Sequence, residues 1–276
     1  MLKIPLVNTV IKSTIRKKLG MRKARIMVSG AAPIPVNLIH WYKSLGMELG
    51  EMFGMTENTA YSHANYDGIK IGTVGKLWPD AEMKLSDEGE ILIRHKALML
   101  GYYKDPETTA STFTSDGFLR TGDRGAVDAD GFLTVTGRMK DQFKTDKGKF
   151  IAPAPIELAL LANTDIEQVC VVGMGIPQPI ALVVPSAQGL AKERHAFETS
   201  LADTLKAVNK GLESYEKLQA LVVMRAGWTI ENGLLTPSMK VKRSEVEKIH
   251  MQNYPRWYAE NTPVVWEQPD NTLRQR

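Results

Sequence analysis

The sequence has little cysteine and lacks a long unbroken apolar run. Cys170 is the single cysteine among 276 residues, so no internal disulfide can form. It lies in the apolar run Val169–Val172, which indicates a small buried hydrophobe. One such thiol suits a reducing compartment, and we expect a cytoplasmic protein. Glycines and prolines interrupt the apolar stretch 168–185, which excludes the roughly 20 unbroken apolar residues of a membrane-spanning helix.

Acidic residues are missing from the beginning of the chain. Nine lysines and arginines precede the first acidic residue, Glu48, although the net charge of the whole chain is only +4. A basic helix is predicted over 8–19, and a solvated face or a peripheral contact with a membrane would explain its charge. The basic residues have no aromatic residues between them, so we expect no nucleic-acid partner.

Length and composition predict a globular protein of about two domains, at roughly 150 residues per domain. Hydrophobic residues make up 43% of the chain and charged residues 24%, which excludes disorder and coiled coil. The first part alternates between strand and helix: a buried strand over 25–28, a helix that Pro35 opens and Gly46 ends, and an extended segment over 47–53. This alternation favours a parallel sheet covered by helices.

Short strands and tight turns follow between residues 69 and 135, and they predict an antiparallel sheet or small barrel. Asp105 and Pro106 begin a short helix within this stretch, as N-cap and first helical residue. The polar segment 137–148 is the expected boundary. We therefore predict a first domain over 1–139, with a β-rich subdomain over 67–139, and a second domain over 140–276.

The second domain should be a compact α/β unit, so the expected fold class is α/β (α+β). The predicted elements are helices over 155–161, 191–209 and 244–250 and strands over 167–172, 180–184 and 218–224. Residues 268–276 are expected to fray. The five histidines show no metal-ligand spacing with Cys170 or with one another, so no zinc site is predicted.

Several loops combine small, hydroxyl and acidic residues after predicted strands, where open α/β sheets bind ligands. They are the segments 29–33 (SGAAP), 54–57 (GMTE), 120–123 (RTGD), 137–141 (GRMKD) and 236–240 (TPSMK). This ordered series resembles the adenylate-forming, AMP-binding superfamily of acyl-CoA synthetases. The segments 101–109, 145–157 and 235–243 are most similar to long-chain fatty acyl-CoA synthetases.

The resemblance implies a fold: the rest of a large N-terminal domain with a barrel-like β subdomain, then a small mobile C-terminal domain. It also implies an adenine pocket lined by Ser29, Gly30, Ala31, Ala32 and Pro33. In the aromatic-Gly-x-Thr-Glu motif, Phe53 would stack on adenine, followed by Gly54 and Met55, Thr56 would meet the phosphate and Glu57 would hold Mg²⁺. The family usually has tyrosine at Phe53, and the change keeps the stacking but removes the phenol hydroxyl. Hard oxygen ligands of this kind suit Mg²⁺.

Four more residues receive roles from the resemblance. Asp123 would accept hydrogen bonds from the ribose hydroxyls, joined by Arg138 across a hairpin. Lys140 matches the hinge of the small domain, and Gly148 matches a glycine that approaches the pantetheine arm of CoA. From the residues alone, the alternative for Asp123 is a turn residue that caps its own backbone, and the alternative for Arg138 is a solvated cation at a strand end.

Lys240 is the predicted catalytic residue. Adenylation brings an anionic carboxylate to an anionic phosphate, and a lysine supplies a compact cation that can bridge the two. Spacing alone favours the alternative, in which Lys240, Lys242 and Arg243 form a solvated basic turn before a helix.

The resemblance implies ATP-dependent ligation of a fatty acid, long-chain acids being the expected class, to CoA through an acyl-adenylate. It covers the C-terminal half of the family's usual length, and no Ser/Thr/Gly-rich phosphate loop precedes Ser29. We therefore expect a site that a missing upstream half or a partner chain completes. Two alternatives stay open: a non-catalytic AMP-binding fragment or subunit, and transfer of the acyl group to a carrier protein instead of CoA.

Overall fold

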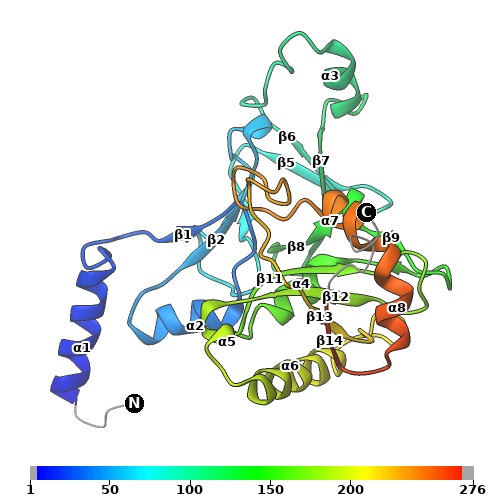
Figure 1. Ribbon diagram of the computed structural model, residues 1–276. Helices are drawn as coiled ribbons and strands as arrows, with labels where there is room; N and C mark the ends of the chain where they lie inside the picture. The colour runs from blue at the N-terminus through cyan, green and yellow to red at the C-terminus, as the bar shows by residue number, and fades with distance from the viewer. Residues whose placement is uncertain (1–4, 269–276) are drawn as a thin grey trace. The chain divides into compact units, whose positions relative to one another are not determined.

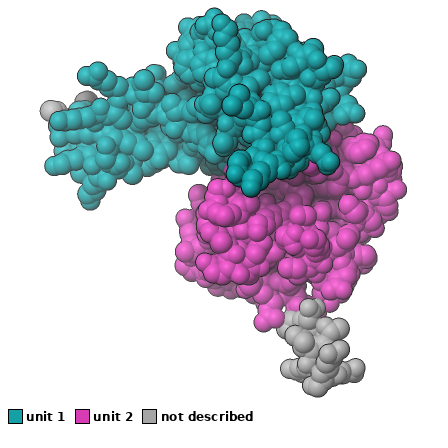
Figure 2. Space-filling model, turned by 90° about the horizontal axis from the view of Figure 1, so that it is seen from above, with its two compact units in different colours: residues 1–139 teal, residues 140–276 magenta. Residues whose placement is uncertain are grey.

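The computed structural model describes residues 5–268, and the chain divides into two compact units, Met1–Met139 and Lys140–Arg276 (Figure 2). Each unit is described by itself. Residues 1–4 lie outside the described residues, and so does the predicted frayed end over 268–276 except for its first residue, Gln268. No helix among residues 5–268 combines the length and the apolar character needed to cross a membrane.

A small mixed sheet begins the first unit (Figure 1). The sheet consists of β1 (Val28–Ser29), β2 (Gly50–Phe53), β3 (His63–Ala64) and β4 (Lys76–Leu77). Two helices accompany it in the chain: α1 (Pro5–Lys18) precedes β1, and α2 (Val36–Ser44) lies between β1 and β2. β1 runs parallel to β2, whereas β2, β3 and β4 pair antiparallel. The basic helix and the helix after Pro35 are both confirmed, and Gly46 follows α2 with a φ of 76°, a left-handed conformation that glycine adopts without strain.

The buried strand predicted over 25–28 is wrong in length and in burial. β1 comprises only Val28 and Ser29, and Ile26 before it is 83% exposed. The apolar run was interpreted as an interior strand, but β1 is the edge of its sheet and pairs with β2 alone. An apolar segment is buried only where a second layer covers it, and the described residues place none over Ile26.

The second sheet of the first unit is antiparallel throughout. It consists of β5 (Glu82–Leu85), β6 (Glu90–Arg94), β7 (Leu119–Val127) and β8 (Leu133–Arg138), and α3 (Pro106–Thr112) lies between β6 and β7 in the chain. Ile91, Ile93 and Leu133 form its buried cluster. Asp105 caps α3 as predicted, because its carboxylate accepts from the Thr108 N–H at 3.0 Å.

This second sheet is open, so the structure confirms the antiparallel sheet and not the closed barrel among the two predicted forms. Its strand order is β5-β6-β7-β8, and the two outer strands, β5 and β8, do not pair with each other. Closed barrels need more strands than four at the usual strand tilt. Hydrogen bonds join this sheet to the first one, because Val74 donates to the Leu133 carbonyl and Leu133 donates to the Gly75 carbonyl.

The second unit has a four-stranded sheet with helices on both faces, and its mixed α/β architecture agrees with the predicted fold class. A two-stranded hairpin, β9 (Phe143–Lys144) and β10 (Phe150–Ile151), precedes the sheet. The sheet contains β11 (Ile166–Val172), β12 (Ile180–Pro185), β13 (Leu221–Val223) and β14 (Val264–Trp266). Its helices are α4 (Pro153–Leu160), α5 (Ala187–Leu190), α6 (Arg194–Asn209), α7 (Arg243–His250) and α8 (Tyr254–Ala259).

Two buried clusters lie on opposite faces of this sheet. α4 and α6 cover one of them, and α7 and α8 cover the other (Figure 1). Alternate residues of β11 belong to different clusters: Val169 and Val171 face one core, and Cys170 and Val172 face the other. Because both faces are covered, the strands are continuous apolar runs, which is why the sequence located β11 and β12 correctly.

Cys170 is fully buried, as predicted, but it is not surrounded by apolar groups alone. The Arg243 guanidinium lies beside it, with Nη1 at 3.3 Å from the Cys170 Sγ and Nη2 at 2.5 Å from the Glu157 carboxylate. Burial nevertheless raises the pKa of the Cys170 thiol to about 12. The first residue of α7 is thus tied to α4 and β11 in the interior of the unit.

The thiol of Cys170 should be unreactive in the folded protein. Its thiolate is scarce at mildly alkaline pH because the pKa is raised, and the buried sulfur excludes a reagent. We expect a chromogenic thiol reagent to label the native chain slowly and the guanidinium-unfolded chain completely within minutes. Prompt labelling of native protein would show that β11 is accessible and would contradict this core.

Candidate functional site

Two of the predicted loops leave the same edge of the first sheet. Ser29 at the end of β1 pairs with Glu51 of β2 in parallel register. Since the carboxyl ends of parallel strands meet at one edge, the segment 29–33 after β1 and the segment 54–57 after β2 emerge together. The structure thus brings the expected adenine loop and the Thr-Glu motif side by side, as a ligand site of an open α/β sheet requires.

The segment 29–33 is held close to β2. Ala31 has a φ of 68°, a left-handed conformation that few residues with a side chain adopt. A Cβ on Gly30 would come within 3.0 Å of the Met52 Cγ, so this turn has little space for a larger residue. The Glu51 carboxylate accepts from the Ile34 N–H at 3.4 Å, and burial raises the pKa of Glu51 despite this hydrogen bond.

The motif after β2 forms a tight turn that continues into a short 3-10 helix, Thr56–Asn58. A Cβ on Gly54 would lie 2.5 Å from the Ala60 Cα, so only glycine fits there. Asn58 is fully buried, and its Oδ1 accepts from the Met55 N–H at 2.9 Å. These contacts fix the backbone while the Thr56 side chain stays exposed.

Glu57 has a partner that the sequence did not indicate. The Tyr102 hydroxyl donates to the Glu57 Oε1 at 2.9 Å, and the Met99 N–H donates to the Glu57 carbonyl at 2.8 Å. Burial and this hydrogen bond to the carboxylate both raise the pKa of Tyr102, which therefore stays a neutral donor. Tyr102 lies in the segment 101–109, which supports the family resemblance, but the resemblance assigns Tyr102 no role.

The chemistry of these side chains fits a magnesium ion bound together with phosphate. Glu57 offers a second carboxylate oxygen besides the one that Tyr102 contacts, and Thr56 offers an exposed hydroxyl. Mg²⁺ is typically held by one or two carboxylates together with substrate phosphates and water. Among residues 5–268 no group of three or more His, Cys, Asp or Glu side chains forms a metal cage.

Phe53 closes β2 and is half-buried. It packs against the cluster of Ile91, Ile93 and Leu133, so one part of the ring is covered by the second sheet. His63 on β3 lies opposite in the register, with ring centroids 6.4 Å apart, and burial lowers the pKa of this imidazole to about 4. The ring beside Phe53 is therefore neutral at physiological pH.

Asp123 and Arg138 face each other on neighbouring strands of the second sheet. They are direct partners in the β7–β8 register, and Arg138 Nε lies 3.6 Å from Asp123 Oδ1. The Asp123 side chain is 17% exposed and the Arg138 side chain 64% exposed, so the pair is accessible from the arginine side. The predicted proximity across the hairpin is confirmed, whereas the ribose as their ligand stays a prediction.

The remaining predicted residues belong to the second unit. Lys140 is exposed in a 3-10 turn, Met139–Asp141, at the start of the unit. Gly148 has a φ of 77° in the turn between β9 and β10, where its N–H donates to the Thr145 carbonyl at 2.9 Å. Glycine is favoured there by backbone conformation.

Lys240 lies in a closed loop before α7. The Thr236 N–H donates to the Lys240 carbonyl at 2.8 Å, and the Lys240 N–H donates to the Thr236 Oγ1 at 3.0 Å. An isolated bridge between Leu235 and Val241 closes the stem. Lys240 is exposed, and within the described residues no carboxylate is within ion-pair distance of its ammonium group. The loop thus presents an unpaired cation on an ordered backbone.

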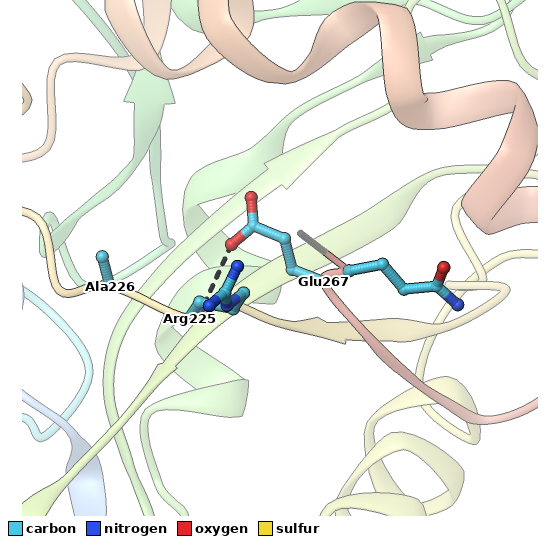
Figure 3. Close-up of a pocket in the computed structure, with 4 residues that line it drawn as sticks. Arg225, Ala226 and Glu267 are labelled. Atoms are coloured by element: carbon cyan, nitrogen blue, oxygen red, sulfur yellow. Dashed lines mark hydrogen bonds between the residues drawn. The ribbon is translucent and has the colours of Figure 1, made fainter. Parts of the chain in front are cut away.

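A hollow elsewhere in the second unit holds none of the predicted site residues. Arg225, Ala226, Glu267 and Gln268 line it, and its volume is about 350 Å³ (Figure 3). The Glu267 carboxylate accepts from the Arg225 backbone N–H at 2.9 Å and approaches the His250 Nδ1 at 3.5 Å. Through its hydrogen bond to Arg225, Glu267 connects the end of β14 to the segment that follows β13.

Two family models match most of the chain. The AMP-binding enzyme model matches residues 4–103, and the model of the AMP-binding enzyme C-terminal domain matches residues 140–262. A long-chain-fatty-acid–CoA ligase, FadD15 of Mycobacterium bovis (strain ATCC BAA-935 / AF2122/97), is 35% identical over 257 residues, which are 87% of this chain and 42% of the relative. Long-chain-fatty-acid–CoA ligase 1 of Cavia porcellus is 33% identical over 283 residues, covering 91% of this chain and 40% of the relative.

A solved structure has the same fold. It is the A-PCP didomain of a carboxylic acid reductase from Segniliparus rugosus in complex with AMP, with a TM-score of 0.71 and 27% identity. The similarity covers 94% of this chain and 38% of that one. The chain therefore spans about two fifths of the length of the proteins that it matches.

Gly54 should tolerate no side chain. In Gly54→Ala the new Cβ would overlap the Ala60 backbone, so the turn must shift, and we expect a loss of about 1–3 kcal/mol in the free energy of unfolding of the first unit. Thermal unfolding followed by circular dichroism measures it. Gly211→Ala is the matched control, because its Cβ would make only an ordinary contact of 3.8 Å with the Val208 carbonyl. Equal melting of both variants would contradict the close approach.

Proposed function

Because the chain belongs to the AMP-binding enzymes and is homologous to long-chain-fatty-acid–CoA ligases, we propose that it forms the nucleotide-binding and acyl-transfer part of an acid–thiol ligase. The observation that carries the proposal is the pair of loops at the carboxyl ends of β1 and β2, which pack the small-residue turn beside the Thr-Glu motif. The first unit would be part of the large domain, and the second unit the small mobile domain with Lys240.

The nucleotide would be held by the first unit. The segment 29–33 and the free face of Phe53 would enclose adenine, since an aromatic ring stacks on a base. The Asp123 carboxylate would accept from the ribose hydroxyls, and Arg138 beside it would add a donor. Thr56 would donate to the phosphate, and Glu57 would hold Mg²⁺, which neutralises phosphate charge when bound.

Adenylation would join a fatty acid to AMP. A carboxylate oxygen attacks the α-phosphorus of ATP, the bond between that phosphorus and the α,β-bridging oxygen breaks, and pyrophosphate leaves with the electron pair. Lys240 would lie between the two anions, where its point charge offsets their repulsion and stabilises the charge that develops in the transition state. Because the hydrogen bonds between Thr236 and Lys240 already order the loop, Lys240 would lose little conformational entropy when it binds the two anions.

Thioester formation would follow on the same acyl-adenylate. The CoA thiolate attacks the acyl carbonyl, a carbon–sulfur bond forms, and AMP leaves with the electron pair of the broken acyl–phosphate bond. Rotation about Lys140 would move Lys240 away from the acyl-adenylate and bring the turn at Gly148 toward it. Long-chain acids are the proposed substrates, because FadD15 and the ligase of Cavia porcellus are both named long-chain-fatty-acid–CoA ligases.

Transfer to a carrier protein is the second candidate. The carboxylic acid reductase similar in fold comprises an adenylation domain and a PCP domain. Both candidates share adenylation and differ in the thiol that accepts the acyl group, so supplying CoA or a carrier protein as the acceptor separates them. The cytoplasm is the proposed compartment, with fatty acid, ATP and CoA as the proposed partners.

AMP binding should depend on the ribose hydroxyls through Asp123. We expect the chain to bind AMP more tightly than the dideoxy analogue of AMP, and Asp123→Asn to weaken AMP binding by about tenfold, because a charge-assisted hydrogen bond becomes a neutral one. Isothermal titration calorimetry measures both affinities. The analogue should bind the variant as it binds the wild type. Equal affinity of the wild type for AMP and the analogue would contradict a ribose site at Asp123.

Lys240 should matter for adenylation and not for thioester formation. Lys240→Ala should lower acyl-CoA formation from fatty acid, ATP, Mg²⁺ and CoA by at least about 100-fold, because a transition-state cation is lost. Starting from preformed acyl-adenylate and CoA, the variant should match the wild type. Chromatography of acyl-CoA over a panel of medium- to long-chain acids gives both rates.

Lys206→Ala on α6 is the matched control, since Lys206 is also an exposed lysine of the second unit. Wild-type activity with acyl-adenylate alone would place the triphosphate-binding part outside this chain. An Lys240→Ala variant as active with ATP as the wild type would refute the role of Lys240. Wild type inactive in both reactions would refute the proposed catalysis by this chain.

A further inference from the structure

β7 contains an irregularity at the residues proposed to bind ribose. Glu90 of β6 pairs with Arg124, whereas Leu92 pairs with Arg120, so the segment 121–123 faces the single residue Ile91. Gly122 within it has a φ of 70°, a left-handed conformation. This is a β-bulge, and bulges near binding sites redirect side chains. The bulge ends at Asp123, which is where pairing with Arg138 begins.

The Glu90 carboxylate holds this bulge with both oxygens. Its Oε1 accepts from the Gly122 N–H at 3.0 Å, and its Oε2 accepts from the Arg120 Nη1 at 3.1 Å. The Glu90 side chain is only 11% exposed, which removes most of the competing water. A nearly buried carboxylate that accepts from a backbone N–H and a guanidinium forms two charge-assisted hydrogen bonds.

Thr121 completes the support from the other side. Its hydroxyl donates to the Ile91 carbonyl at 2.7 Å and accepts from the Asp123 N–H at 3.1 Å. The consecutive backbone N–H groups of Gly122 and Asp123 therefore both donate to side chains. The Glu90 and Thr121 side chains thus hold the backbone of the bulge at two successive residues.

We propose that Glu90 is a positioning residue for nucleotide binding: its carboxylate fixes the bulge so that Asp123 meets both Arg138 and the ribose hydroxyls. The inference rests on the proposed function, because it requires a nucleotide at Asp123. Glu90 itself does not touch the ligand. It acts through the Gly122 backbone, one residue before Asp123, and a small change there moves a carboxylate that must meet two neighbouring hydroxyls.

Glu90→Gln tests the proposal with little change of shape. The amide offers one acceptor and one donor group, so it satisfies either the Gly122 N–H or the Arg120 guanidinium but not both. We expect affinity for AMP to fall about tenfold and affinity for the dideoxy analogue of AMP to stay unchanged, so that the preference for AMP is lost. Unchanged binding of the analogue also shows that the variant is folded.

Glu82→Gln is the matched control. Glu82 of β5 forms an ion pair with Arg94 of β6 in the same sheet, at 2.5 Å, but contacts no residue of the bulge. Loss of the Glu82–Arg94 ion pair should leave the affinities for AMP and for its dideoxy analogue unchanged. The double variant Glu90→Gln/Asp123→Asn should bind AMP no more weakly than Asp123→Asn alone, because the two residues act on one contact.

The outcomes separate this inference from the proposed function. If Glu90→Gln lowers the affinities for AMP and for the analogue equally, or lowers neither, the positioning role is overturned while the ribose site stands. Additive losses in the double variant overturn it as well. A wild-type chain that does not prefer AMP over the analogue overturns the ribose site itself, and the positioning role with it.

Discussion

The two hydrogen bonds that the Glu90 carboxylate accepts are the interaction on which the β7 bulge and the position of Asp123 depend. In an unbroken strand, residues two apart share a face, and Thr121 and Asp123 would follow the same direction. The bulge breaks that period, so Thr121 is buried while Asp123 lies opposite Arg138. A register defect in one strand thereby brings two opposite charges to an accessible position, and a buried acid maintains it.

Much of the fold could be predicted where local chemistry dominates. Asp105 and Pro106 determine the start of α3, and the apolar runs of β11 and β12 determine two central strands, because both faces of their sheet are covered. The loops at 29–33 and 54–57 were located from the strands that precede them. Burial of Ile26 could not be predicted, because it depends on a covering layer and not on the residue.

Contacts between distant segments could not be predicted from the sequence either. Tyr102 reaches Glu57 across 45 positions, and Glu90 reaches Gly122 across 32. Neither pair has a spacing that signals contact. The Asp123–Arg138 pair is the exception. The two residues lie on the two strands of one hairpin, so their positions in the sequence indicate that they face each other. In the second unit, Arg243 likewise connects the stem of the Lys240 loop to Glu157, far away in the sequence.

Because β1 is an edge strand, the lysines and arginines that precede it can act through charge repulsion, without a bound ligand. Edge strands with exposed apolar residues are templates for adding a strand of another chain, and Ile26 and Val28 have that character. Lys23 and Arg25 immediately precede them. A second copy joining β1 in parallel register would stack these cations about 5 Å from their own counterparts. Electrostatic repulsion between identical copies would therefore oppose the addition of a second copy to β1 in parallel register.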